Sequence, residues 1–220
     1  NAPQSSHSLN SISGGASDAC TGGSVLITSG GSADASTGNV VLSSNDAEGD
    51  SSGDVAMQTG NAGVASGSVS IATGGAVESG QAGHIGISAG KSSGSSGGDL
   101  SFSAGASSGN NENGGDIILT SGAASGQVQS GTGGDFQVFA GDSTSNFGGS
   151  VAFKSGASTD GASGNVGLST GNSAGAGVSG SVDIKTGTSL AGASGSIAVT
   201  TGDATGGRGG SITVSVGSGD

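Results

Sequence analysis

Apolar residues recur in pairs along almost the whole chain, and successive pairs follow one another at a nearly constant interval. A small or polar residue usually separates the two members of a pair. This alternation places both apolar side chains on one face of a β-strand. The first members form a column of thirteen residues: Val25, Val40, Val55, Val69, Ile85, Leu100, Ile117, Phe136, Val151, Val166, Val182, Ile197 and Ile212. The second members form another: Ile27, Leu42, Met57, Ile71, Ile87, Phe102, Leu119, Val138, Phe153, Leu168, Ile184, Val199 and Val214.

Glycine frames each of these predicted strands. An opening glycine stands two positions before the first apolar residue, and a closing glycine stands five positions after it in every copy but one. Asn45 takes the place of the closing glycine in that copy, and asparagine is among the residues that best tolerate a positive φ. We therefore interpret both glycine columns as corners between strands.

A short strand with two apolar side chains cannot bury them alone, so a repeat of this length indicates units that cover one another. The pattern predicts an all-β fold, a flattened β-solenoid (β-helix) of about 13 coils, roughly 15–16 residues per coil, with glycine corners. Its length would be roughly 60 Å from the usual strand spacing. Small residues two positions after each closing glycine predict a second wall of Ala and Ser. Residues 23–220 form this solenoid, and residues 1–22 are a degenerate rung or a partial cap.

Composition limits the kinds of core and partner. The 220 residues include 51 Gly, no Trp, no Tyr and five Phe, so order must come from backbone hydrogen bonds and close packing of small residues. A net charge of −12 with four Lys and Arg excludes the basic surface of a nucleic-acid binder. No apolar run approaches the roughly 20 residues needed to cross a bilayer, so we expect no membrane insertion. Cys20 is the single cysteine, which excludes an internal disulfide.

No set of residues predicts catalysis. His7 and His84 are the only histidines, and neither has a nucleophile and an orienting group at a recognisable spacing. We expect no enzymatic activity, no catalytic residues and no organic cofactor.

Three acidic residues suggest a cation site. Asp99, Asp116 and Asp135 precede the first apolar residue in three successive copies, so stacked copies would align their carboxylates. Oxygen ligands in a row suit Ca²⁺. The same column elsewhere holds Ser24, Asn39, Asp54, Ser68, Asn165 and Ser181. These residue types favour the simpler interpretation that the column forms hydrogen bonds in a turn.

Two aromatic residues suggest a small interaction patch. Phe139 lies at an outward position of its strand, and Phe147 follows in the next connecting segment, beside two enlarged connections. Phe147 could equally fold inward and fill a gap.

The units "GGSVLITSG", "GSVSIATGG", "GSVDIKTG" and "GSIAVTTG" resemble glycine-rich β-solenoid repeat proteins of algal, other protist and microbial cell surfaces and filaments. The resemblance covers the chain from about residue 23 onward and implies an extracellular or cell-surface location. It transfers no functional residue.

A second resemblance is to β-solenoid antifreeze proteins, which order water on a flat face of small residues. The corresponding face here would lie on the connecting halves of the copies. It would use Ser108, Ser125, Thr144, Thr159 and Thr205.

We therefore expect a non-enzymatic structural module of an extracellular filament, a cell-surface fibre or an adhesin. It would be a rigid rod that stacks end to end or continues into a longer repeat array, because the last copy, "GSITVSVGSGD", keeps its apolar columns without a polar cap. Ice binding is the alternative function, with ice as the ligand.

Overall fold

The fold is described from a computed structural model, which places residues 10–18, 20–77, 80–125 and 131–219. Throughout these residues the backbone is extended or turning, and none of them is assigned to a helix or a strand. The chain divides into two units, Asn1–Phe102 and Ser103–Asp220, which are described separately.

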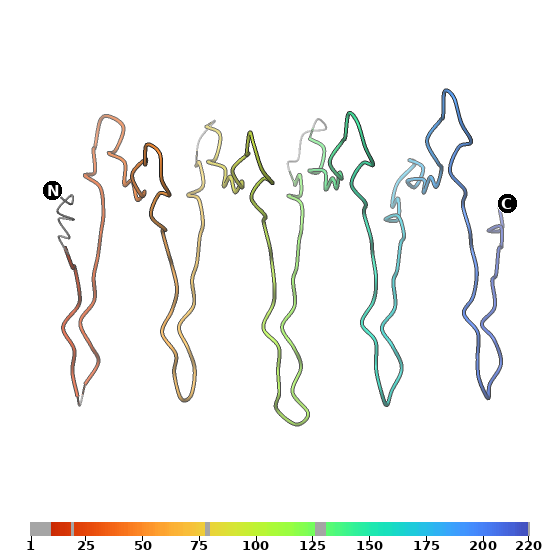
Figure 1. Cartoon of the computed structure of the whole chain (residues 1–220), viewed down its shortest axis with the longest axis horizontal. Helices are drawn as coiled ribbons and strands as arrows, with labels where there is room; N and C mark the ends of the chain where they lie inside the picture. The colour runs from red at the N-terminus through yellow and green to blue at the C-terminus, as the bar shows by residue number, and fades with distance from the viewer. Residues whose placement is uncertain (1–9, 19, 78–79, 126–130, 220) are drawn as a thin grey trace. The chain divides into compact units, whose positions relative to one another are not determined.

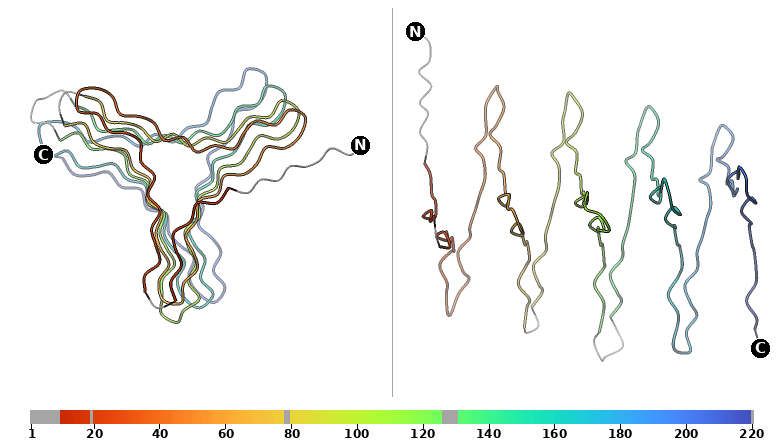
Figure 2. Two further views of the ribbon diagram at one scale, coloured as in Figure 1. Left: turned by 90° about the vertical axis from the view of Figure 1, so that its left-hand side faces the viewer. Right: turned by 90° about the horizontal axis from the view of Figure 1, so that it is seen from below.

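Each unit alternates extended segments with loops (Figure 1). An extended segment runs from an opening glycine to the closing glycine of the same copy and carries one pair of apolar residues. A loop then joins that closing glycine to the opening glycine of the next copy. Within a unit, successive loops point in three directions (Figure 2, left), so every third loop points the same way. Loops 105–115, 156–164 and 202–210 of the second unit, at the bottom of Figure 1, share one direction.

The two glycines at the base of a loop form what we call a neck, where two stretches of backbone approach each other. In seven necks the later glycine donates its N–H to the carbonyl of the earlier one, at N···O distances of 2.7–3.1 Å. The pairs are Gly23 with Gly15, Gly38 with Gly30, Gly98 with Gly90, Gly115 with Gly105, Gly134 with Gly122, Gly149 with Gly141, and Gly164 with Gly156. These are the backbone hydrogen bonds between separate segments in the described residues, and each one closes a loop on itself.

The residue before the closing glycine separates bonded necks from unbonded ones. In six of the seven bonded necks it is Ser or Ala, namely Ser29, Ala89, Ala104, Ser121, Ala140 and Ser155, and in the seventh, between Gly15 and Gly23, it is Gly14. In five described necks without the bond it is Thr: Thr59, Thr73, Thr170, Thr186 and Thr201. There the threonine Cγ2 lies 3.3–3.4 Å from the position that a Cβ on the opening glycine would take. The extra methyl group of a β-branched residue thus accounts for the wider neck.

Two necks depart from this rule in instructive ways. Thr73 keeps a weaker link, because its Oγ1 donates to the carbonyl of Gly83 at 3.2 Å. The neck between Asn45 and Gly53 lacks the backbone bond among the described residues although Ser44 precedes Asn45. Every bonded neck therefore has glycine at its closing position and at its opening position.

At some necks the opening glycine leaves little room for a side chain, whereas at four bonded ones, those of Gly38, Gly115, Gly134 and Gly164, a Cβ would meet its nearest neighbour at 3.5 Å, an ordinary contact. A Cβ on Gly149 would lie 3.2 Å from both the Ala140 Cβ and the Gly141 N, whereas a Cβ on Gly141 would meet nothing within 4 Å. The interpretation of the glycine columns and Asn45 as positive-φ corners is wrong. In the described residues a positive φ occurs at Gly49, Asn111 and Gly206, which all lie within loops.

Serine closes the turns within the loops. In six loops a serine two positions after the closing glycine accepts a hydrogen bond through its Oγ from a backbone N–H two or three residues later. Examples are Ser32 with Ala35 at 3.0 Å, Ser158 with Gly161 at 2.9 Å and Ser189 with Gly192 at 3.1 Å. These serines of the small-residue column, which the sequence suggested as a second wall, thus form turns, and the wall itself stays a prediction.

The N-terminal segment follows the same local pattern where the structure describes it. Gly23 bonds to Gly15, and the Ser17 Oγ accepts the N–H of Cys20 at 3.0 Å, as in the later loops. Residues 1–9 lie outside the described residues. The division into a 1–22 segment and a 23–220 array stays a prediction.

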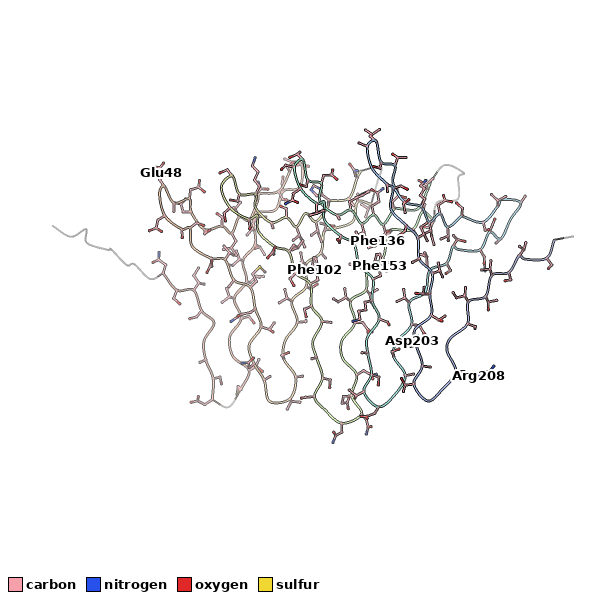
Figure 3. All side chains as sticks on the ribbon, turned by 45° about the vertical axis from the view of Figure 1, so that its right-hand side comes forward. Glu48, Phe102, Phe136, Phe153, Asp203 and Arg208 are labelled. Carbon is pink, nitrogen blue, oxygen red and sulfur yellow. The ribbon has the colours of Figure 1, made fainter. Side chains whose placement is uncertain are left out.

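The apolar columns remain exposed. First-column side chains are 48–65% exposed and second-column side chains 50–92%, and the described residues contain no buried apolar side chain. Phe102, Phe136 and Phe153, labelled in Figure 3, are 63–76% exposed. Neither stacked coils nor a sheet between copies is seen in the described part of the chain, so the flattened β-solenoid stays a prediction.

We expect Gly149→Ala to destabilise the folded protein by about 1–3 kcal/mol, because the new methyl group would collide with the neck backbone. Gly141→Ala is the matched control. It has open space around its Cβ and should leave stability unchanged or raise it by about 0.4–1 kcal/mol. Thermal unfolding followed by circular dichroism compares the two. Equal destabilisation by both substitutions would contradict the neck geometry.

We also expect Ala140→Thr to open its neck. Hydrogen exchange at the Gly149 amide should accelerate roughly 2- to 13-fold, the range that the loss of one backbone hydrogen bond gives. The reciprocal change, Thr186→Ala, should slow exchange at Gly195. Residue-resolved hydrogen exchange measured by NMR tests both, and unchanged exchange in the two variants would show that this residue does not control the neck.

Candidate assembly surface

The most extensive candidate site is the pair of apolar columns, which we call the aliphatic stripe. It is present in every copy, because each extended segment contributes one residue to each column. Apolar side chains that are half exposed or more in so many successive copies are unusual for a protein that acts as a monomer. The backbone beside them also lacks interstrand hydrogen bonds other than those at the necks, within the residues described. Exposed side chains and unpaired backbone together form a surface suited to another extended chain.

A hollow in the second unit lies between two successive repeats of the chain. It has a volume of about 250 Å³ and is lined by Phe153, Val166, Gly167 and Leu168. Phe153 belongs to the second column of one copy, and the other three residues belong to the next copy. No ionisable side chain lines the hollow, so it suits an apolar side chain better than a polar substrate.

The three candidate calcium ligands are not gathered into a site. Asp99 belongs to the first unit, while Asp116 and Asp135 belong to the second. Across the described residues, no three His, Cys, Asp or Glu side chains are grouped closely enough to hold a metal ion. Asp135 accepts a long hydrogen bond of 3.5 Å from Gln137 Nε2. A calcium site on this column stays a prediction that needs further chains or a different packing.

The two candidate patch residues are both exposed, Phe139 at 83% and Phe147 at 94%. Phe147 lies in a loop held by two hydrogen bonds. Its N–H donates to Asn146 Oδ1 at 2.9 Å, and the Asn146 N–H donates to Ser143 Oγ at 3.1 Å. The inward alternative for Phe147 is therefore not seen. The phenylalanines of the apolar columns are exposed as well, so exposure does not single out this pair, and the patch stays a prediction.

The residues of the ice-binding alternative are spread over several loops of the second unit. The loops that carry Ser108, Thr159 and Thr205 share one direction, whereas those carrying Ser125 and Thr144 point elsewhere (Figures 1 and 2). A flat face for ice would require all five on one side. The arrangement gives ice binding no support, and it stays a prediction.

Two further features bear on function. Cys20 is a free thiol and is exposed. Across the part of the chain that the structure describes, no helix is long and apolar enough to span a membrane.

Comparison of the chain with protein-family models, with curated proteins and with solved structures finds no match. The resemblances to cell-surface repeat proteins and to antifreeze solenoids therefore rest on the repeat units alone.

We expect Asp116→Asn to leave thermal stability unchanged, because Asn39 and Asn165 occupy the same column in other copies and asparagine has nearly the same size and shape as aspartate. Calcium chloride should then shift the melting temperature of the variant and of the original protein equally. A calcium-induced rise in the original protein that the variant lacks would instead establish the aspartate column as a cation site.

Proposed function

We propose that this protein is a non-enzymatic structural module of an extracellular filament, a cell-surface fibre or an adhesin, and that it works as a rigid rod formed by self-association. The observation that carries this proposal is the aliphatic stripe, which repeats without interruption and stays exposed from the first copy to the last. A surface that recurs at a fixed interval along the chain suits a partner with the same interval.

The exposed area supports assembly. The chain exposes 21,734 Å², while a compact monomer of its mass would expose roughly 8,600 Å² and an unfolded chain roughly 28,700 Å². A chain that is ordered in this conformation therefore needs other molecules to cover much of its surface. Structural assemblies provide such cover permanently.

Charge is arranged to keep the assembly soluble. Many charged residues lie on the loops, such as Glu48, Asp203 and Arg208 in Figure 3, whereas the apolar columns lie on the extended segments. With a net charge of −12, the loops of neighbouring rods repel one another at low ionic strength. Growth along the rod is thereby favoured over sideways clumping.

We expect the purified protein to form unbranched fibres of uniform width that lengthen as its concentration rises. Negative-stain electron microscopy at low salt, over a hundredfold range of concentration, measures this. Raising the ionic strength should increase lateral clumping, because it screens the loop charges. Short particles whose length does not depend on concentration would contradict end-to-end growth.

A further inference from the structure

We propose that two further copies of this chain lie alongside it, between its successive turns, to form an intertwined homotrimer with one threefold axis. This inference goes beyond the proposed function, because it concerns pairing along the length of the chain. It holds or fails independently of whether the assembled rods join end to end.

The first argument is the spacing of the turns within each unit. One turn takes three copies, since every third loop points the same way (Figure 2, left). Successive turns stand apart in Figure 1, and the chain's own side chains do not close the space: Leu42 is 73% exposed and Ile184 is 71% exposed. The space next to each extended segment is therefore available to another chain.

The second argument is the backbone of the extended segments. An extended strand satisfies its N–H and C=O groups by pairing with a strand about 4.8 Å away. In the described residues the hydrogen bonds between segments occur at the necks and leave the apolar parts of the extended segments unpaired. Extended segments from the two partner chains would complete these hydrogen bonds and would also cover the aliphatic stripe.

The third argument identifies the occupant as the same chain. A partner must present an extended segment, two apolar residues and a glycine neck, and it must repeat them at the interval that separates Val25, Val40 and Val55. A second molecule of the same chain has the same sequence and therefore repeats these features at the same interval. Rotation by a third of a turn moves each loop onto the next loop direction, so three copies related by that rotation are equivalent and close the symmetry.

The area is sufficient for an obligate assembly. The difference between the observed 21,734 Å² and the surface of a compact monomer is roughly 13,000 Å² per chain. Obligate interfaces commonly bury about 2,000–5,000 Å² or more. The available surface thus exceeds what two partners need, even if part of it remains in contact with water.

The decisive measurement is the mass of the native protein. A single chain has a mass of 19.8 kDa, and the trimer has three times this mass. Light scattering after size exclusion, with native mass spectrometry, should show the trimer and no loss of mass on tenfold dilution. A folded monomer overturns the proposal in favour of a single-chain solenoid. A dimer, an unfolded monomer or a ladder of masses without a stable trimer also overturns it.

A matched pair of variants locates the interface. Ile184→Asp places a charge in the aliphatic stripe, and Leu190→Asp places one on the next loop, where the side chain is 105% exposed. The first should lower the mass from that of the trimer to that of a single chain, whether or not the released chain stays folded. The second should leave the trimer intact. Trimers in both variants, or loss of the trimer in both, would refute pairing through the stripe.

Subunit exchange separates intertwined chains from rods joined at their ends. Trimers with and without nitrogen-15 labelling are mixed and followed by native mass spectrometry. Intertwined chains should exchange between trimers only after denaturation and refolding. Trimers that contain labelled and unlabelled chains should then appear in binomial proportions. Exchange within minutes under native conditions would show that the copies are merely apposed and would overturn the intertwined arrangement.

Discussion

The close approach of two backbone segments at each neck is the contact on which the rest of the fold depends. It turns a glycine-rich chain with few large side chains into a series of closed loops. Where the residue before the closing glycine is Ala or Ser, the two glycines come within hydrogen-bond distance, as Gly149 and Gly141 do at 2.9 Å. At the tightest necks a side chain on the later glycine would press the two segments apart, since a Cβ on Gly149 would lie 3.2 Å from the Gly141 N. Glycine at this column therefore reflects packing more than a need for unusual backbone angles.

The necks close the loops, but they leave the backbone of the extended segments unpaired and their apolar side chains exposed. Each copy contributes only two apolar side chains, which is too little to form a core with its own backbone. The stability of the fold must then come from contacts between repeat units, which belong either to one chain or to different chains. The same constraint explains why the described chain has well-defined loops and yet no buried apolar residue.

The sequence predicted some levels of this structure better than others. The glycine positions coincide with the boundaries between loops and extended segments, which depend on residues close together in the chain. The strands that the period of two predicts stay a prediction. Asn45 lacks the positive φ that its place in the glycine column suggested, and several serines form turns that the sequence did not predict. A glycine or a serine can serve a corner, a close contact or a turn with the same spacing. The contrast between Thr and Ala or Ser before the closing glycine was visible in the sequence. Its meaning became clear only when the neck distances were known.

The candidate sites were harder to predict, since a column such as Asp99, Asp116 and Asp135 gathers its carboxylates only if successive copies stack directly. Within a unit the loops point in three directions, so loops that are neighbours in sequence are not neighbours on a face. The two apolar columns could be read from every copy, but the sequence suggested that stacked copies would bury them, whereas in the described residues they are exposed.

The recurrence of loop direction at every third copy also constrains how such a chain can change in length. Within a unit, insertion or deletion of one whole copy would leave each neck and turn intact but rotate every later loop by one position. Loops that had shared a face would then be distributed differently. Duplication of three copies within a unit would preserve the pattern of faces. Residues that share a face of a unit therefore recur every three copies, which is three times the interval of the repeat itself.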